Sequence, residues 1–363
     1  MDRIYKIVLT GGPCGGKSTA IPHIRNHFQK LGFNVFSAPE AATILFSNGC
    51  SLINASIDQI IKFQSNLMQL QQFLEDKFEA FARSSDKPSI IICDRGMLDG
   101  SAFVSADMWQ SILMLNNWNT PEIRDKRYDA VFHMITAADG ARDHYNHNNR
   151  VRTETPDKAI ELDHKIQSAW LGHPHLRVID NNTDFDGKVS RLIKLINNIV
   201  SEQPLELEHK YLIKSLNIDK WTVPYQDVFI KQIYLKSDGS TNRIRKRGQD
   251  GNFTYYLTRK TPCWWSPNLG NIEVEYKISQ DEYIVLLDEA DYRYRPIIKT
   301  RRCFLWKNQY FELDIFKDLK ENLIILEIEV DDILTPIELP PFLNVLEEVT
   351  NNPSYSNKEL AKL

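Results

Sequence analysis

The first half of the chain alternates short hydrophobic runs with longer segments of mixed polarity. Short apolar runs followed by turn residues are typical of strands buried in a parallel sheet. We expect five such strands, at residues 4–10, 34–40, 89–96, 128–136 and 176–180. Helices are expected at residues 18–32 and 186–200. This alternation predicts an α/β domain, with a parallel sheet and helices on both faces.

A glycine-rich turn, GGPCGGKST, directly follows the first predicted strand. It matches the pattern G-x-x-x-x-G-K-[ST], whose backbone N–H groups curl around phosphate oxygens at the start of a helix. In that pattern Lys17 reaches the β- and γ-phosphates, and the Ser18 hydroxyl binds Mg²⁺. We therefore expect nucleotide contacts from Gly11, Gly12, Pro13, Cys14, Gly15, Gly16, Lys17, Ser18 and Thr19.

Charged residues stand where the second and third predicted strands end, at the sheet edge where α/β folds bind ligands. Asp94 is placed to hold the water shell of Mg²⁺. Glu40 could orient or deprotonate an acceptor hydroxyl or water, or could only favour the start of a helix. Arg95 and Asp99 could bind substrate hydroxyls or each other, and we place Arg95 among the ligand-binding residues.

A polar insertion, at about residues 140–172, separates the fourth and fifth predicted strands. In P-loop kinases such a segment is a lid whose arginines close over the transferring phosphoryl group. Arg142, Arg150 and Arg152 would have that role here, although a solvated helical hairpin would have a similar composition. The chain has no N-K-x-D motif, so the choice between GTP and ATP stays open.

After residue 202 the pattern changes to charges at spacing two, beginning with Glu206, Glu208 and Lys210. In a strand, such charges share one face. Similar patterns follow at residues 241–248, 254–260, 271–276, 297–302, 310–316 and 323–330. An open sheet with solvated charges is one explanation. A closed antiparallel barrel with a charged interior is the other, and we favour it because residues 323–330 are flanked by apolar residues.

Charges inside such a barrel would need partners, since each buried charge costs several kcal/mol unless it is paired. The available partners are one another, a polyphosphate and a divalent metal. Basic side chains would then bind phosphate oxygens, and carboxylates would hold Mg²⁺ or Mn²⁺.

The segment ELEHK also matches the E-x-E-x-K signature of CYTH domains, the triphosphate tunnel metalloenzymes, and the later charged segments follow that family's order. The resemblance implies an eight-stranded tunnel that binds triphosphate-containing ligands with a divalent metal. It implies metal ligands at Glu206, Glu208, Glu312, Asp314, Glu327 and Glu329. It implies phosphate contacts at Lys210, Arg243, Arg245, Arg247, Lys260, Lys299 and Arg301.

The chain as a whole resembles the TRP-like-channel translocation-defect family, in which a nicotinamide-riboside-kinase-like P-loop domain precedes a CYTH domain. The segments GGPCGGKST, ELDHKIQSAWLGHP and PPFLNVLEEVT carry this resemblance. It implies domains at residues 1–202 and 203–363, binding of GTP and anionic phospholipid, and regulation of membrane-protein trafficking. A nucleoside-type kinase joined to a triphosphatase, and a scaffold with relic sites, are the alternatives.

Composition narrows the setting of the protein. The net charge of −4 over 363 residues argues against a general nucleic-acid binder. The five cysteines form no CxxC pair, which favours a reducing compartment with free thiols. No apolar run is long enough for a leader or a membrane span. We expect a cytoplasmic protein, and only the family resemblance adds peripheral membrane association.

Overall fold

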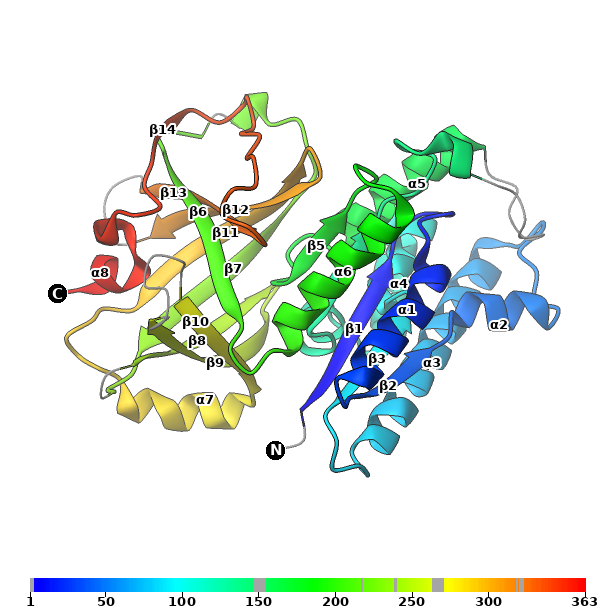
Figure 1. Ribbon diagram of the computed structural model, residues 1–363, viewed down its shortest axis with the longest axis horizontal. Helices are drawn as coiled ribbons and strands as arrows, with labels where there is room; N and C mark the ends of the chain where they lie inside the picture. Colours follow the sequence, from blue (N-terminus) through cyan, green and yellow to red (C-terminus); the bar gives the residue numbers. More distant parts are fainter. Residues whose placement is uncertain are drawn as a thin grey trace. The chain divides into compact units, whose positions relative to one another are not determined.

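The computed structural model describes residues 3–145, 155–216, 218–237, 240–262, 271–317, 319 and 323–363. The chain divides into two compact units, Met1–Ile196 and Asn197–Leu363. Figure 1 shows a sheet flanked by helices in the first unit and a strongly curved sheet in the second.

The first unit is built on a parallel sheet of five strands in the order β2-β3-β1-β4-β5. The strands are β1 (Ile4–Thr10), β2 (Asn34–Ala38), β3 (Ser89–Asp94), β4 (Ala130–Met134) and β5 (Leu176–Ile179). Ile7, Val8 and Leu9 of the central strand are fully buried, as their uninterrupted apolar run requires. The predicted parallel sheet is confirmed.

Helices pack against this sheet and connect its strands. They are α1 (Lys17–Lys30), α2 (Ala41–Ser47), α3 (Ile57–Ala82), α4 (Ala106–Leu115), α5 (Pro156–Ala169) and α6 (Phe185–Val200). Shorter helical turns are η1 (Met97–Phe103), η2 (Glu122–Lys126) and η3 (Arg142–His144). The long helix α3 begins at a capping box in which the Ser56 side chain accepts from the Gln59 N–H. The Thr155 side chain caps α5 by accepting from the Lys158 N–H, and Pro156 occupies the first turn of that helix.

The second unit is a closed antiparallel barrel. Its strands are β6 (Leu205–Ile213), β7 (Tyr225–Tyr234), β8 (Thr241–Gln249), β9 (Asn252–Pro262), β10 (Asn271–Ile278), β11 (Ile297–Trp306), β12 (Gln309–Lys317), β13 (Ile324–Val330) and β14 (Val345–Glu348). The sheet order is β10-β9-β8-β7-β11-β12-β13-β6-β14, and pairing of β10 with β6 closes eight strands into a ring. The predicted eight-stranded antiparallel barrel is confirmed.

Short helices complete the second unit: α7 (Gln280–Leu286), α8 (Asn357–Ala361), η4 (Ile218–Lys220), η5 (Leu287–Glu289) and η6 (Pro353–Tyr355). None of the helices among the described ranges is long and apolar enough to cross a membrane.

The charged segments are explained by the barrel's two faces. Residues that alternate with the charges, such as Leu313, Leu326 and Ile328, pack with Phe304 and Phe311 in a hydrophobic cluster. The charged residues at the intervening positions therefore face the interior, which we call the lumen.

Strand β7 was not expected from the charge pattern. Val228, Ile230 and Gln232 lie opposite inward-facing residues of β11 and β8, so this strand presents apolar and amide side chains where its neighbours present charges. Its two charges, Asp227 and Lys231, are four residues apart on the other face. A search for charges at spacing two therefore misses it.

Candidate functional site

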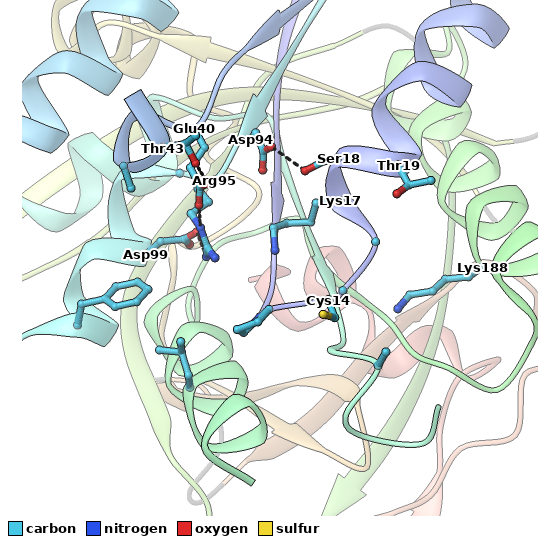
Figure 2. A pocket seen from close by; sticks show the side chains of 18 of the residues that line it. Cys14, Lys17, Ser18, Thr19, Glu40, Thr43, Asp94, Arg95, Asp99 and Lys188 are labelled. Atoms are coloured by element: carbon cyan, nitrogen blue, oxygen red, sulfur yellow. Dashed lines mark hydrogen bonds and ion pairs between the residues drawn. The ribbon is translucent and has the colours of Figure 1, made fainter. Parts of the chain in front are cut away.

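A cavity of about 880 Å³ lies in the first unit, at the carboxyl ends of its parallel strands. Its lining includes the predicted phosphate loop, the residues that follow β2 and β3, and the loop that follows β5. Figure 2 shows Lys17 near the middle of the cavity, with Glu40, Arg95 and Asp99 on one side and Lys188 on the other.

The phosphate loop has the backbone form that its glycines allow. Gly11 has φ +131° and Gly16 has φ +87°, and a Cβ at Gly11 would clash with the carbonyl oxygen of Met134. The Lys17 ammonium folds back over the loop and donates to the carbonyl oxygens of Gly11 and Gly12 at 2.8 and 2.9 Å. Burial, and then repulsion by Arg95, lowers the pKa of Lys17 to about 8.

Ser18 and Asp94 meet at the start of α1. The Ser18 hydroxyl donates to the Asp94 carboxylate at 3.5 Å. Burial raises the pKa of Asp94, although the nearby Lys17 ammonium opposes this effect. A hydroxyl and a carboxylate beside the phosphate loop are the oxygen ligands that Mg²⁺ prefers, so the donor chemistry fits this ion.

Arg95 connects the two carboxylates on the left of Figure 2. Its guanidinium binds Glu40 at 2.6 Å and Asp99 at 3.3 Å. Strand β2 ends at Ala38, and Glu40 is the residue that precedes α2, but its side chain makes no capping hydrogen bond there. It accepts instead from Arg95 and from the Thr43 hydroxyl at 2.5 Å, so it is held toward the cavity.

The lid arginines are only partly described. Arg142 lines the cavity, with an exposed side chain 3.6 Å from Asp157. Arg150 and Arg152 lie outside the described residues, so their role in the lid stays a prediction.

Sequence reasoning missed three side chains around the phosphate loop. Asp163 of α5 accepts from the Gly12 N–H at 2.5 Å and from the Thr136 N–H at 3.3 Å. The buried His133 lies 3.1 Å from the same carboxylate. Burial opposes ionisation of Asp163, but His133 and the Gly12 N–H hold its pKa below the usual range.

Lys188 of α6 reaches the cavity from the other side. Its ammonium donates to the Ile135 carbonyl at 2.8 Å and to the Asn181 side chain at 2.7 Å. Burial lowers its pKa to about 8. No local motif marked Asp163, His133 or Lys188, because each joins the site through a distant element.

The barrel lumen holds a network of paired charges. Lys210 lies 3.0 Å from both Glu208 and Glu327. Arg301 binds Asp314 at 2.7 Å, Glu327 at 2.6 Å and also Glu312. Each of these side chains is largely or fully buried, so the charges compensate one another inside the protein.

A second part of the network lies on β8, β9 and β10. Arg243 binds Glu273 at 2.8 Å, and Arg245 binds Glu275 at 3.1 Å. Lys260 and Arg259 are neighbours on β9, so only one of them can face the lumen. Lys260 pairs with Glu206, whereas Arg259 is exposed.

The remaining predicted lumen residues take similar positions. Lys299 is fully buried and pairs with Asp314. Arg247 is almost fully buried on the inward face of β8. Among buried side-chain nitrogens, Nε of Arg243, Nε of Arg245 and Nε2 of Gln232 have no hydrogen-bond partner. Such donors suit an anionic ligand.

The carboxylates of the lumen have the chemistry of metal ligands but not the arrangement. Burial, with repulsion from Glu273, Glu208 and Glu329, raises the pKa of Glu206 to about 8. A divalent cation would relieve that repulsion. Within the part of the chain that the structure describes, however, no three His, Cys, Asp or Glu side chains are grouped to hold a metal. Arg301 stands among Glu312, Asp314 and Glu327 instead.

Known proteins resemble the two units separately. Residues 6–188, just over half of the chain, match a family model described as an AAA domain. The chain belongs to this AAA-domain family. Among curated proteins, none matches the chain.

Solved structures resemble the second unit of this AAA-family protein. The inorganic triphosphatase NE1496 is 27% identical with a TM-score of 0.31, over 43% of this chain and 93% of that chain. The PH1819 protein from Pyrococcus horikoshii OT3 is 22% identical with a TM-score of 0.29, over 34% of this chain and 77% of that chain. Because both TM-scores are low, the assignment of the second unit as a closed barrel rests on its own strand order. A P-loop-like domain and a barrel lined with charges support binding of nucleotides and phosphates by two domains.

Proposed function

We propose that this protein binds a nucleoside triphosphate with Mg²⁺ in its first unit and a triphosphate or other phosphate-rich ligand with a divalent metal in its second. The observation that carries the proposal is that each unit gathers buried cations beside carboxylates. A phosphate-bound divalent metal satisfies both kinds of charge at once.

In the first unit, binding begins with Lys17. Its ammonium leaves the carbonyl oxygens of Gly11 and Gly12 and reaches the β- and γ-phosphates, while the loop's N–H groups hold the phosphate oxygens. Ser18 and Asp94 would hold Mg²⁺, which neutralises charge on the phosphates when bound. Arg95, Glu40 and Arg142 surround the reacting end, where the phosphoryl group passes to water or to another acceptor. Either GTP or ATP suits these contacts.

In the second unit, the buried cationic side chains would bind the phosphate oxygens of the ligand. They are Lys210, Arg243, Arg245, Arg247, Lys260, Lys299 and Arg301. The released carboxylates would hold Mg²⁺ or Mn²⁺: Glu206, Glu208, Glu312, Asp314, Glu327 and Glu329. The metal would supply charge neutralisation and polarise the phosphate.

Resemblance to the TRP-like-channel translocation-defect family supports a more specific function. We propose that the domains are residues 1–202 and 203–363, with a lid at about residues 140–172, and that the protein is a GTP-binding regulator of membrane-protein trafficking. An anionic phospholipid headgroup is then a candidate ligand for the lumen's cations, and the protein would be cytoplasmic and peripheral to membranes.

A second candidate, a nucleoside-type kinase joined to a metal-dependent triphosphatase, is favoured by Glu40. Its carboxylate faces the cavity beside Lys17 and Arg95, where an acceptor hydroxyl would need a hydrogen-bond partner.

Thermal unfolding with separate ligands tests the proposal. A non-hydrolysable nucleoside triphosphate with Mg²⁺, and tripolyphosphate with Mn²⁺, should each raise Tm. Lys17→Ala should abolish the first shift only, and Arg245→Ala the second only. The exposed residues Lys30 and Arg259, changed to alanine, are the matched controls. If neither ligand raises the Tm of the wild type, the protein is a scaffold with relic sites and the proposal is wrong.

A further inference from the structure

Arg95 follows β3 in a backbone conformation that is unusual for its residue type. Its φ is +75°, in the left-handed region where the Cβ crowds the following carbonyl oxygen. A residue other than glycine stays in this region only where the surrounding contacts hold it there. Observed outliers of this kind gather at functional sites, so the contacts that hold Arg95 bear on its role.

The turn at Arg95 directs its side chain toward the phosphate loop. Nη1 of the guanidinium donates to the Gly11 carbonyl oxygen at 3.3 Å, and the Lys17 ammonium donates to the same oxygen at 2.8 Å. Both side chains line the cavity (Figure 2). Because Lys17 marks where the γ-phosphate would lie, the Arg95 guanidinium is within reach of the same phosphoryl group.

Three hydrogen bonds hold the backbone around this turn. The Arg95 N–H donates to the Leu9 carbonyl at 2.9 Å and so continues the pairing of β3 with β1. The Arg95 carbonyl accepts from the Gln71 side-chain amide at 2.8 Å, and the Met97 N–H donates to the Tyr128 hydroxyl at 3.1 Å. The last two contacts come from side chains of α3 and of the segment before β4.

Glu75 of α3 joins the Gln71 and Tyr128 side chains. Its Oε1 accepts from the Gln71 amide at 3.2 Å and from the Tyr128 hydroxyl at 2.9 Å. A carboxylate only accepts hydrogen bonds, so it fixes the direction in which both neighbours donate. The other amide hydrogen of Gln71 is then directed to the Arg95 carbonyl, and the Tyr128 oxygen is left to accept from Met97.

Packing alone does not explain a carboxylate at Glu75. The side chain is fully buried and is not among the described residues that line the cavity. Burial raises the pKa of Glu75, although the Arg127 guanidinium, 2.5 Å away, opposes this effect. Replacing a buried ion pair by apolar side chains is often neutral or stabilising. The hydrogen bonds toward Arg95 give the carboxylate a further role.

We propose that Glu75, Gln71 and Tyr128 are positioning residues for phosphoryl transfer. They hold the left-handed backbone at Arg95 and so keep its guanidinium beside Lys17, where charge develops on the oxygens of the transferring group. The proposal rests on the proposed nucleotide site of the first unit.

The transfer itself balances without a further reagent. The acceptor oxygen forms a bond to the γ-phosphorus, and the bond from that phosphorus to the β,γ-bridging oxygen breaks. The acceptor's proton passes to the Glu40 carboxylate and then to solvent. Because the phosphate loop and Lys17 hold the nucleotide, loss of the positioning residues should weaken binding of the transition state more than binding of the nucleotide.

Tyr128→Phe tests this, since it removes one hydroxyl and keeps the ring. The ground-state probe is the β,γ-imido analogue of ATP or GTP with Mg²⁺. The transition-state probe is ADP or GDP with Mg²⁺ and aluminium fluoride. By calorimetry, the Kd of the aluminium fluoride complex should rise about tenfold or more, while the Kd of the imido analogue should change less than about twofold. Gln71→Met keeps the length of the side chain, removes the amide and should give the same split.

A double-mutant cycle with Arg95→Ala shows whether the effect passes through Arg95. In the Arg95→Ala background, Tyr128→Phe should cause no further loss of affinity for the aluminium fluoride complex, because the side chain that it positions is absent. Gln69→Met, at an exposed glutamine of the same helix, is the matched control and should leave both affinities unchanged.

The positioning proposal is overturned if Tyr128→Phe and Gln71→Met weaken both complexes equally, or weaken neither. It is also overturned if the loss persists in the Arg95→Ala background, or if the wild type binds the imido analogue but not the aluminium fluoride complex. Binding of the imido analogue by each variant shows that it folds. Failure of the wild type to bind that analogue would overturn the proposed function instead.

Discussion

Arg301 is the residue on which the charge balance of the lumen most depends. One guanidinium contacts Glu312, Asp314 and Glu327, three carboxylates that we propose as metal ligands. A metal ion and Arg301 cannot both occupy the space among them. A polyphosphate would resolve the competition by drawing Arg301 away, so that anion and metal bind more tightly together than alone.

Arg301→Gln should therefore separate the two affinities. Without the guanidinium, the Kd of Mn²⁺ in the absence of polyphosphate should fall about tenfold, while the Kd of tripolyphosphate should rise about tenfold, since a charge-assisted hydrogen bond contributes roughly 1.5–3 kcal/mol. Isothermal titration calorimetry measures both. Arg302→Gln is the control, because that side chain faces the other way and binds Asp227. Weaker Mn²⁺ binding in Arg301→Gln would contradict the competition.

The lowered pKa of Lys188 makes the free energy of unfolding depend on pH. Burial lowers its pKa to about 8 in the folded protein, whereas the unfolded chain keeps the ordinary value of about 10.4. Between these values the unfolded state binds more protons, so the free energy of unfolding rises with pH from about 8 to 10.

Lys188→Met should reduce that rise by about 2 kcal/mol, since one pKa unit corresponds to about 1.4 kcal/mol. Lys17 contributes a similar rise of its own, so the slope should shrink rather than vanish. Urea unfolding at pH 8 and pH 10 measures the difference. Lys194→Met, an exposed position on the same helix, should leave the slope unchanged.

At the scale of elements, α5 supports the phosphate loop from behind. Asp163 accepts two backbone N–H groups, from Gly12 and from Thr136, and so joins α5 to the loops after β1 and β4. A Cβ at Gly12 would lie 2.8 Å from the same carboxylate, so the loop and the helix are closely fitted.

Asp163→Ala should loosen the phosphate loop. Two buried N–H groups would lose their acceptor, at roughly 1–3 kcal/mol each, and we expect the Kd of a non-hydrolysable nucleoside triphosphate to rise at least about tenfold. Calorimetry of the full chain measures the change. Asp157→Ala, at an exposed carboxylate of the same helix, should bind as the wild type does. An unchanged Kd in Asp163→Ala would show that α5 does not position the loop.

Some elements could be predicted from the local sequence pattern, and others could not. The five parallel strands follow from their apolar runs. GGPCGGKST predicts the phosphate loop because that loop needs positive φ angles, found here at Gly11 and Gly16, which glycine adopts readily. Strand β7 does not follow, since its inward face carries no charge pair. Its place between β8 and β11 depends on pairing with distant strands.

At the scale of the whole molecule, the net charge of −4 conceals how the charges are distributed. Many of the second unit's charged residues lie in the lumen, where acids and bases occur in similar number and pair with one another. The overall composition is therefore that of an ordinary globular protein, and only the spacing of the charges indicates a charged interior. Each unit has its own core and its own candidate phosphate site.

The sequence alone determined the order of the two domains, the phosphate loop, and which charges share one face of each strand, because these depend on residues close together in the chain. Closure of the sheet by β10 and β6 decided that this face turns inward. The tertiary structure decided the partners. Arg301 meets three carboxylates from β12 and β13, and Asp163 meets Gly12 across more than a hundred residues. Such contacts depend on sheet order and register, which bring together residues that no local spacing relates.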